Sequence, residues 1–479
     1  MLNLKYLSDS CLVRNRKGIF LFLAGNSALY EIDCASGSEF SDVQLSELAN
    51  LISAKIENEN QKTLKQRGLP NTSVSALNLN LTDKCNLACV YCYAKGGNYS
   101  RIMREMSPED SVKAVRNAFM ASDIKRDFRV EFFGGEPLLN FPAFEAASDE
   151  LSEIEKSLNG NRKIVRRVST NLTELTPEML EFFSKVPFIF SVSIDGDQLA
   201  QNSQRPFKNG SPSWEPIIEN LEKIREVCPE SIIVARITVY QQDKRLYEIV
   251  NEIADKNLFD YASIYPAAVE GENHFTAAFR ENYLKIAQNY SKLLSRGRFS
   301  GILELNRFCE GILGRKVALN HCRAGNGYFT ASPDGSVHPC HRLVGDESWN
   351  LGSFDISEKL LSQWQVKVDE RQKCSECQIR YFCGGGCRQE SLKSTGSLVG
   401  NSPKICAFSK LLFEAAMNVC TSINEVSESK LYKFSKISEE LFVFCGQPLA
   451  DRMQPDTIFP ETIDFHGSVM RLKRICFKC

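Results

Sequence analysis

Residues 79–95 of the chain read LNLTDKCNLACVYCYAK. An apolar, strand-like run ends at Leu81, and three cysteines, Cys85, Cys89 and Cys92, follow it directly. Loops that follow strands lie at the C-terminal edge of a parallel α/β sheet, where such folds place their sites. Three thiolates can bind three irons of a cubane and leave the fourth iron open, whereas closed sites use four protein ligands. The CxxxCxxC spacing therefore indicates a cluster with one open iron, although a zinc knuckle or a ferredoxin-type site would also present three cysteines.

From Ser75 onward, apolar, strand-like segments alternate with longer amphipathic, helix-like stretches. This alternation is typical of βα units around a parallel sheet. The sequence therefore predicts an α/β fold whose core is a partial or open (β/α)6 barrel. We place its six strands at Ala76–Leu81, Arg129–Phe133, Ile164–Val168, Ile189–Ile194, Ile232–Val239 and Ala262–Pro266.

The composition divides the chain into four parts. The first carries strand-like runs at Gly18–Ala24 and Ala28–Ile32 and a helical pattern from Val43 to about Gln66, which predict a small α+β module. The second is the predicted barrel. The third concentrates glycine and cysteine, as a small fold held together by metal does. The fourth is a C-terminal tail with a helical start and then little pattern, and we assign it no role. The four parts are residues 1–74, 75–300, 301–420 and 421–479.

The charge balance and the apolar runs exclude several classes of function. The chain has 58 Lys and Arg against 59 Asp and Glu, and this net charge of −1 offers no field to attract a polyanion. The early apolar run Ile19–Gly25 is too short to span a bilayer. We therefore expect a cytoplasmic protein with neither a nucleic-acid nor a membrane partner. A reducing compartment also suits the cysteines, because those after Leu81 cluster at short spacings and thiolates bind metal where disulfides do not.

A second field of cysteines follows the predicted barrel. Its seven thiolates are one short of filling two cubanes, and a double zinc site would use the same residue type. Cys309 lies upstream and is either an eighth ligand or a buried, non-ligand thiol. The seven are Cys322, Cys340, Cys374, Cys377, Cys383, Cys387 and Cys406. The isolated cysteines, predicted to be packing residues, are Cys11, Cys34, Cys228, Cys420 and Cys445.

The first cysteine loop resembles that of the radical S-adenosylmethionine (SAM) superfamily, which has an aromatic residue, here Tyr91, before its last cysteine. The resemblance implies that the open iron chelates the amino and carboxylate groups of SAM and that one electron cleaves SAM to a 5′-deoxyadenosyl radical. Gly134, Gly135 and Glu136 end the second predicted strand and resemble the GGEP motif of the superfamily. Glycines would let the backbone approach the cofactor, and Glu136 would accept hydrogen bonds from the SAM ammonium.

Polar residues at later strand ends also resemble SAM contacts of the superfamily. Arg205 stands where many relatives carry an HDxxR pattern, but here Gln201 and Asn202 precede it, so only the arginine carries over. Arg236 resembles an arginine near the SAM carboxylate, which a guanidinium fork suits, although a lone strand arginine also serves in structural ion pairs. The implied contacts are Ser169, Thr170, Asn171, Ser193, Asp195, Gly196, Arg205 and Arg236.

The order of the second field resembles the SPASM domain, a C-terminal extension of radical SAM enzymes that modify peptides and proteins. The resemblance implies two auxiliary [4Fe-4S] clusters, the first on Cys322, Cys340 and Cys387 and the second on Cys374, Cys377, Cys383 and Cys406. Together with the CxxxCxxC loop, the chain would then hold three [4Fe-4S] clusters and SAM.

Residues 322–346, CRAGNGYFTASPDGSVHPCHRLVGD, resemble maturases of ribosomally made peptides, such as those that form thioether links in SCIFF-type peptides. The resemblance implies a precursor peptide as substrate and an intrapeptide crosslink of thioether, C–C or C–O type. It also implies an external one-electron reductant of flavodoxin or ferredoxin type. Residues 1–74 would bind a leader peptide by adding a strand to a sheet edge, or would serve as a cover for the barrel.

Two other functions remain open for the same residues. Sulfatase-maturing relatives place an aspartate beside the second cysteine of this field as a candidate base, where this chain has His341. A histidine can move a proton near neutral pH, so His341 is the candidate catalytic residue and formylglycine formation stays an alternative. A non-enzymatic iron–sulfur electron carrier would also be rich in cysteine.

Overall fold

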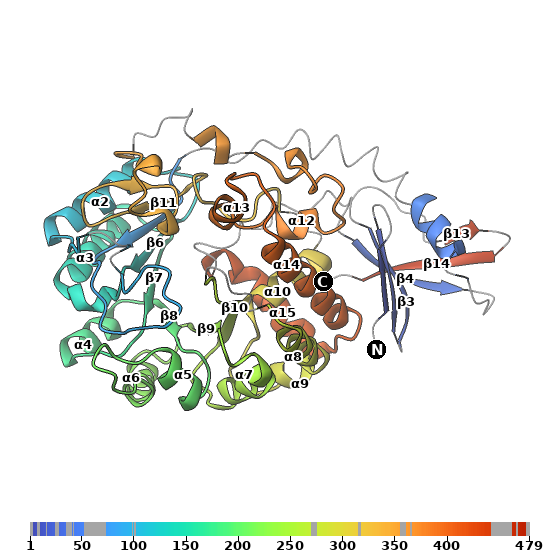
Figure 1. The fold of residues 1–479 in the computed structure, drawn as a ribbon, viewed down its shortest axis with the longest axis horizontal. Helices are drawn as coiled ribbons and strands as arrows, with labels where there is room; N and C mark the ends of the chain where they lie inside the picture. The colour runs from blue at the N-terminus through green and yellow to red at the C-terminus, as the bar shows by residue number, and fades with distance from the viewer. Residues whose placement is uncertain are drawn as a thin grey trace.

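The computed structural model in Figure 1 contains two β-sheets with a cysteine-rich region between them. No helix in the described part of the chain combines the length and the apolar character that a membrane span requires. The structure describes residues 3–475 except 7–9, 16, 24–27, 35–40, 42, 52–72, 98, 100–101, 270–274, 315–317, 355–360, 365, 442–461 and 466–467.

The larger sheet has eight strands in the order β10-β9-β8-β7-β6-β5-β11-β12. The first six strands in this order are parallel and form the predicted βα units, and every predicted strand is confirmed with ends that differ by at most two residues. The sheet continues beyond β5, because a hairpin from the cysteine-rich region adds β11 in parallel. The strands are β5 (Ala76–Asn80), β6 (Phe128–Phe133), β7 (Ile164–Thr170), β8 (Ile189–Ser193), β9 (Ile233–Val239), β10 (Tyr261–Pro266), β11 (Tyr328–Ala331) and β12 (Val337–His338).

Helices follow the parallel strands, and several begin at a side chain that caps them. Ser107 accepts a hydrogen bond from the backbone nitrogen of Asp110, and Pro108 occupies the first turn, where its missing N–H is not needed. Thr176 and Thr276 cap α4 and α8 in the same way. The helices are α2 (Pro108–Met120), α3 (Phe141–Ser157), α4 (Pro177–Lys185), α5 (Gln198–Gln204), α6 (Trp214–Val227), α7 (Leu246–Asp255), α8 (Ala277–Gln288), α9 (Tyr290–Leu294), α10 (Leu303–Gly314), α12 (Arg380–Cys383), α13 (Arg388–Thr395), α14 (Pro403–Cys420) and α15 (Glu425–Leu441).

The two faces of the parallel sheet differ in polarity. On the outer face, strand residues pack against the helices, and the ring of Phe132 lies 4.3 Å from that of Phe144. The opposite face, called the inner face below, has an apolar floor where the strands begin. One step further along the strands it carries polar side chains, among them Asn78, Glu131 and Arg167. The floor consists of Val165, Ile189, Val234, Tyr261, Leu303, Phe434 and Leu441.

Helix α15 supplies two residues of that floor, Phe434 and Leu441, and both are fully buried. The side chain of Arg167 donates a hydrogen bond to the backbone carbonyl of Leu441. The first helix of the predicted C-terminal tail therefore closes the N-terminal end of the parallel strands.

The smaller sheet joins both ends of the chain (Figure 1). Its strands are antiparallel, and β14 pairs with β4 from Met470↔Cys34 to Ile475↔Leu29. Phe22 packs against Phe382 and Phe413, so this sheet lies on the cysteine-rich region. The order is β1 (Asn3–Tyr6), β2 (Ser10–Asn15), β3 (Gly18–Leu23), β4 (Ala28–Cys34), β14 (Ser468–Ile475) and β13 (Thr462–Phe465).

Residues 43–51 form a helix, as the sequence predicts for the start of the run from Val43, and the rest of that predicted helix lies outside the described residues. The two strands predicted in residues 1–74 correspond to β3 and β4. The strands β1, β2, β13 and β14 were not predicted.

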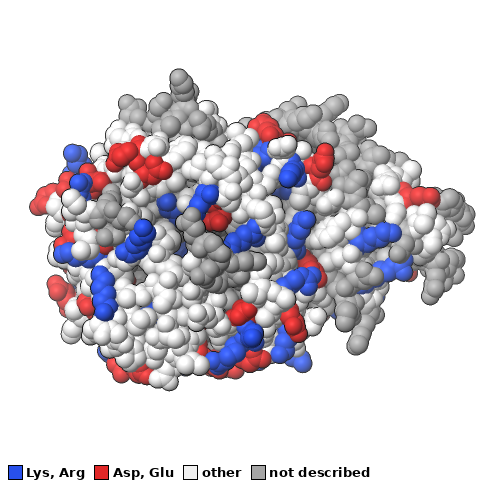
Figure 2. Space-filling model, in the orientation of Figure 1, with Lys and Arg blue, Asp and Glu red and all other residues white. Residues whose placement is uncertain are grey.

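Figure 2 shows acidic and basic side chains interspersed over one face of the molecule, with no large area of a single sign. This distribution agrees with the net charge of −1. The described residues on the face in view therefore form no broad basic surface of the kind that binds nucleic acid.

Candidate active site

The cysteine loop leaves the end of β5 and is held there by the glycines that follow β6. The backbone nitrogens of Gly135 and Glu136 donate to the carbonyls of Thr82 and Lys84, both at 2.8 Å. A Cβ atom on Gly135 would lie 2.6 Å from the carbonyl carbon of Lys84, closer than real Cβ contacts. The close approach that these glycines allow is therefore to the cysteine loop itself, not only to a cofactor as the sequence suggested.

Glu136 is buried, and its carboxylate already accepts three hydrogen bonds. They come from the hydroxyl of Thr170 at 2.7 Å and from the backbone nitrogens of Asn171 and Leu138 at 2.6 and 3.2 Å. Burial raises the pKa of Glu136 to about 7, and the donated hydrogen bonds oppose that rise. This carboxylate ties the end of β7 to the glycine turn, which itself supports the cysteine loop.

Tyr91, Asp195 and Arg205 form one buried network at the loop. The Tyr91 hydroxyl donates to a carboxylate oxygen of Asp195, and Arg205 Nε lies 3.3 Å from the other oxygen. The same Nε donates to the Tyr91 oxygen at 2.6 Å, and Arg205 Nη1 lies 3.6 Å from the sulfur of Cys89. The structure thus brings three of the predicted site residues together and places a guanidinium charge beside one of the loop thiols.

The other two loop thiols also have donors nearby. Asn171 Nδ2 lies 3.9 Å from the sulfur of Cys85, and the backbone nitrogen of Gly96 donates to the sulfur of Cys92 at 3.3 Å. Burial raises the pKa of Cys85 to about 12, and the charge of Glu136 adds to that rise. Because a cluster binds thiolates, loading this loop would release protons.

The seven cysteines of the second field lie in two groups. In the first group, burial and then the charges of Cys387 and Cys322 raise the pKa of Cys340. Arg342 serves this group, because its backbone nitrogen donates to the sulfur of Cys340 at 3.4 Å and its Nη1 lies 3.8 Å from that of Cys387. Arg342 also forms an ion pair with Glu390 at 3.3 Å.

The second group contains Cys374, Cys377, Cys383 and Cys406. Burial is the main cause that raises the pKa of Cys374, and the charges of the other three cysteines add to it. The hydroxyl of Ser409 donates to the sulfur of Cys383 at 3.2 Å, and the guanidinium of Arg371 lowers the pKa values of Cys374 and Cys383 against burial.

The three cysteine groups supply thiol donors of the kind that iron–sulfur clusters bind. In the described part of the chain, no three cysteine, histidine or acidic side chains are close enough to hold one metal ion together. A cubane binds each thiolate through a different iron, so its ligands stand further apart. Each of the three cysteine groups also has an arginine beside it, fully buried Arg371 or partly buried Arg205 or Arg342, which suits the negative charge of a cluster.

His341 connects the second field to the first loop. Its ring centroid lies 6.2 Å from that of Tyr93, which follows Cys92, and 5.1 Å from that of Phe133 at the end of β6. Its Nδ1 lies 3.0 Å from the hydroxyl of Tyr328. Burial, followed by the charges of Arg342 and Arg236, lowers the pKa of His341 to about 3, which keeps the ring neutral in the ligand-free protein.

The remaining predicted residues lie on the inner face or at its strand ends. The Ser169 hydroxyl donates to Glu131, which is fully buried and 3.7 Å from Arg167. Arg236 pairs in register with Ser193, and its charge acts on Glu131 and on Glu304 of α10. The Arg236 side chain makes no ion pair or hydrogen bond with the described residues, whereas its backbone carbonyl accepts a hydrogen bond from the backbone nitrogen of Ile194 at 3.1 Å.

Sequence reasoning missed Glu131, Tyr93 and Arg342. Glu131 is a charged residue between Val130 and Phe132 in a strand that was predicted to be buried, and that exception to the pattern is the signal that would have found it. Arg342 and Tyr93 directly follow residues that were assigned, but their mutual contact, with the Arg342 guanidinium 5.5 Å from the Tyr93 ring, depends on the fold.

Cys309 lies on α10 and is fully buried. Its thiol forms a hydrogen bond with the thiol of Cys420 on α14. Burial raises the pKa of Cys420, and this hydrogen bond raises it further. The thiol thus packs between two helices, which is the second of the two interpretations that the sequence allows. Cys11, Cys228 and Cys420 are buried as predicted for packing residues.

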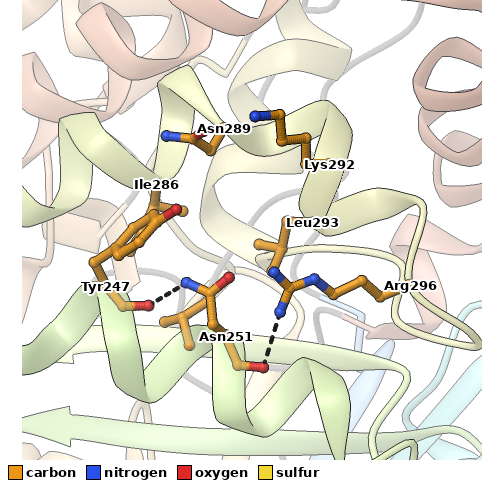
Figure 3. Close-up of a pocket in the computed structure, with 8 residues that line it drawn as sticks. Tyr247, Asn251, Ile286, Asn289, Lys292, Leu293 and Arg296 are labelled. Carbon is orange, nitrogen blue, oxygen red and sulfur yellow. Dashed lines mark hydrogen bonds between the residues drawn. The ribbon is translucent and has the colours of Figure 1, made fainter.

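Figure 3 shows a cavity lined by residues of α7, α8 and α9, and no cysteine lines it. The space in it that is open to the centre of a water molecule is about 30 Å³. Asn251 and Arg296 line it, and they bond to the backbone carbonyls of Tyr247 and Asn251. None of the residues that line this cavity is a predicted site residue.

The comparisons with known proteins identify the region that carries the first loop. Residues 79–252 match the Radical SAM superfamily. This part of the chain is a radical SAM domain. It spans β5 to α7 and includes Cys85, Cys89 and Cys92. A radical SAM domain implies an enzyme that uses SAM and a [4Fe-4S] cluster, and the three loop thiols are the donors that fit such a cluster.

Two curated relatives match most of the chain. The cysteine-type anaerobic sulfatase-maturating enzyme of Clostridium perfringens is 26% identical over 330 residues, which cover 64% of this chain and 86% of that enzyme. The radical SAM cyclopropyl synthase TigE of Paramaledivibacter caminithermalis is 24% identical over 385 residues, which cover 74% of this chain and 76% of the synthase.

Two solved structures share the fold. The hexahistidine-tagged anSMEcpe with bound AdoMet has a TM-score of 0.61 at 22% identity, and the match covers 74% of this chain and 98% of that one. Streptococcus suis SuiB bound to the precursor peptide SuiA has a TM-score of 0.53 at 15% identity, and the match covers 85% of this chain and 100% of that one. These matches support the α/β radical SAM fold.

Proposed function

We propose that this radical SAM enzyme modifies a ribosomally made precursor peptide and forms an intrapeptide crosslink. The observation that carries the proposal is the contact between the two cysteine regions, where His341 and Arg342 meet Tyr93. Closing a crosslink removes two hydrogen atoms, so a reaction of this kind needs an electron acceptor beside the site of hydrogen removal. Cys340, the neighbour of His341, would hold part of such an acceptor.

The three cysteine groups would hold three [4Fe-4S] clusters, two of them in a SPASM domain. When bound, the loop cluster and SAM would supply a 5′-deoxyadenosyl radical that removes a hydrogen atom from the peptide. Arg205, Arg342 and Arg371 would offset the negative charge of the three clusters. An external one-electron reductant, of flavodoxin or ferredoxin type, would deliver the electron that starts each turnover.

The residues at the strand ends would hold SAM. Arg236 suits the carboxylate of SAM because its guanidinium has no other ion-pair partner in the described part of the chain. Tyr91, Asp195 and Arg205 would fix the cysteine loop. Glu136 already accepts three hydrogen bonds within the protein. Its two carboxylate oxygens can together accept about four, and we assign the remaining capacity to the SAM ammonium. The other assigned contacts are Gly134, Gly135, Ser169, Asn171 and Ser193.

His341 is the proposed proton-handling residue. It lies between Tyr93, Phe133 and Tyr328, where the second field meets the inner face. A neutral imidazole has one nitrogen that accepts and one that donates a hydrogen bond. We propose that it takes the proton released when the peptide crosslink closes.

The smaller sheet is the proposed site for a leader peptide. Among the residues that the structure describes, its edge strand β1 pairs with β2 alone. An extended peptide would add to that edge through backbone hydrogen bonds.

Formylglycine formation is the second candidate, and the similarity to sulfatase-maturating enzymes favours it. The two functions differ in the product. Formation of formylglycine converts one side chain to an aldehyde, whereas a crosslink joins two residues. A non-enzymatic electron carrier is disfavoured, because the radical SAM domain implies an enzyme.

Mass spectrometry tests the proposal. The enzyme would be co-expressed with short peptides encoded beside its gene, and each peptide would be fragmented after purification. The proposal expects a peptide that has lost two hydrogen atoms and resists fragmentation between two residues. An aldehyde that reacts with a hydrazide probe would favour formylglycine instead. Cys89→Ala serves as the control, because loss of a loop ligand should abolish either product.

A further inference from the structure

Two asparagines on the inner face have carboxamides without a partner. Asn78 and Asn80 are both 0% exposed, and in the described part of the chain neither the oxygen nor the nitrogen of either side chain has a hydrogen-bond partner. Buried polar groups are almost always hydrogen-bonded, because an unpaired buried amide loses its bonds to water. Two unpaired carboxamides at alternate positions of one strand therefore indicate that a ligand completes them.

The neighbours of Asn78 supply a further free acceptor. Asn78 pairs in register with Glu131 of β6 on one side and with Thr330 of β11 on the other. One oxygen of Glu131 accepts from Ser169, and the other, Oε2, is buried without a partner among the described residues. Asn78, Asn80 and Glu131, called the polar row below, thus offer carboxamide donors, carboxamide acceptors and one carboxylate oxygen.

The polar row lies toward the second cysteine field. The pKa of Tyr328 is raised by burial, with the charges of Cys340 and Glu131 among the smaller causes. The Tyr328 hydroxyl contacts His341. The residues assigned to SAM stand mostly at the strand ends, whereas Asn78 and Glu131 stand in mid-strand, between those ends and the apolar floor.

We infer that Asn78, Asn80 and Glu131 bind an amide group of the substrate. This group is either a backbone peptide group or the carboxamide of an Asn or Gln side chain. This inference rests on the proposed function. An amide is the matching ligand because the Asn78 NH₂ donates to its carbonyl while Asn78 Oδ1 or Glu131 Oε2 accepts from its N–H. A site with unpaired buried groups rejects ligands that lack the matching polar atoms, so the polar row would select the residue to be modified.

The stability of the ligand-free protein tests the first half of the inference. Asn78→Leu keeps the size of the side chain and removes both unpaired atoms. We expect its thermal midpoint to equal or exceed that of the wild type. Asn306 is the matched control, because it is equally buried but its side chain bonds to Tyr290 and Ser300. Asn306→Leu should lower the midpoint. A midpoint of Asn78→Leu that falls as far as that of the control would make Asn78 structural and overturn the inference.

Binding tests the second half, with the reconstituted enzyme and two probes under anaerobic conditions. N-acetylasparagine N′-methylamide has both a backbone and a side-chain amide, and N-acetylleucine N′-methylamide has only the backbone. Equilibrium dialysis should show that Asn78→Leu binds a probe about tenfold more weakly than the wild type, because one polar partner is lost from a buried site. Equal binding of both probes identifies a backbone group, and preference for the first identifies a carboxamide side chain.

Three results would overturn the inference. They are no binding of either probe to the wild type, equal binding by wild type and Asn78→Leu, and a matching loss of SAM affinity in the variant, which would assign the carboxamides to SAM. The proposed function fails separately. An enzyme that binds the probe but modifies no peptide refutes the function and leaves the site, whereas unchanged peptide modification by Asn78→Leu refutes the site alone.

Discussion

Arg205 places its guanidinium 3.6 Å from the sulfur of Cys89. The same side chain is the ion-pair partner of Asp195, which is fully buried. The Arg205 guanidinium therefore lies beside both the Cys89 thiol of the first loop and the Asp195 carboxylate. Arg205 keeps both contacts although Gln201 and Asn202 stand where many relatives have the His and Asp of the HDxxR pattern.

Replacing Arg205 by methionine should destabilise the protein strongly. The change leaves Asp195 buried without its cation, and loss of one partner of a buried pair costs about 3–5 kcal/mol. Urea denaturation of the cluster-free protein measures this loss. Arg116→Met is the control, because Arg116 pairs with Glu150 at the surface and its loss should have a far smaller effect. Similar losses in both variants would contradict the buried network.

The unfolding free energy should depend on pH through Glu136. Its pKa is raised to about 7 in the folded protein by burial, from an ordinary value of 4.5. Between these values the folded state holds a proton that the unfolded chain has released, so stability is greatest at the acid end and falls as the pH rises. The fall from this group is at most about 3 kcal/mol.

Glu136→Gln removes the ionisation and should reduce that fall. Denaturation of cluster-free wild type and variant at about pH 5 and about pH 7 provides the comparison. An unchanged difference between the two pH values in the variant would mean that Glu136 ionises normally in the folded protein.

Arg342 should raise the reduction potential of the first of the two proposed auxiliary clusters. A guanidinium beside Cys387 and a backbone donor to Cys340 favour the reduced, more negative state of a cluster. In Arg342→Gln the midpoint should fall by about 30–60 mV, up to a tenfold change in the ratio of reduced to oxidised cluster. Potentiometric titration followed by electron paramagnetic resonance measures the shift. Arg342→Lys keeps the charge and should shift the midpoint less, and an unshifted midpoint in Arg342→Gln would remove Arg342 from this role.

Phe434 tests the floor of the inner face. Its side chain projects from α15 and is fully buried against residues near the start of the parallel strands. Phe434→Ala should cost about 3–5 kcal/mol, because the cavity cannot fill with water or collapse fully. Tyr432 on the same helix is 41% exposed, and Tyr432→Ala should cost far less. Equal effects of the two changes on the urea midpoint would show that α15 does not close the strands.

The parallel strands could be predicted because their outer residues are apolar and their loops carry the motifs. Leu77 and Leu79 show this pattern, and the cysteines directly follow their strand. The division of the seven later cysteines into two groups came from the resemblance and not from their spacing. The sequence placed Tyr91, Asp195 and Arg205 at strand ends and loops, but it could not predict that they contact one another. That contact depends on how the segments that follow β5, β8 and α5 pack together.

The smaller sheet could not be predicted in full. Strand β14 pairs with β4 from the opposite end of the chain, and no local pattern records a partner so distant in sequence. The inner-face residues Asn78 and Glu131 were missed for a different reason. Polar residues in a buried strand contradict the propensity of the strand, and such contradictions gather at functional sites.

The formation of 5′-deoxyadenosine tests the central claim most directly. The wild type and the Cys89→Ala variant would be reconstituted in parallel with iron and sulfide in the absence of oxygen. Both would then be incubated with SAM and dithionite. We expect the wild type to hold about 12 irons per chain, as for three cubanes, and to form 5′-deoxyadenosine, while the variant forms none. Wild-type enzyme with intact clusters that forms no 5′-deoxyadenosine would contradict the account.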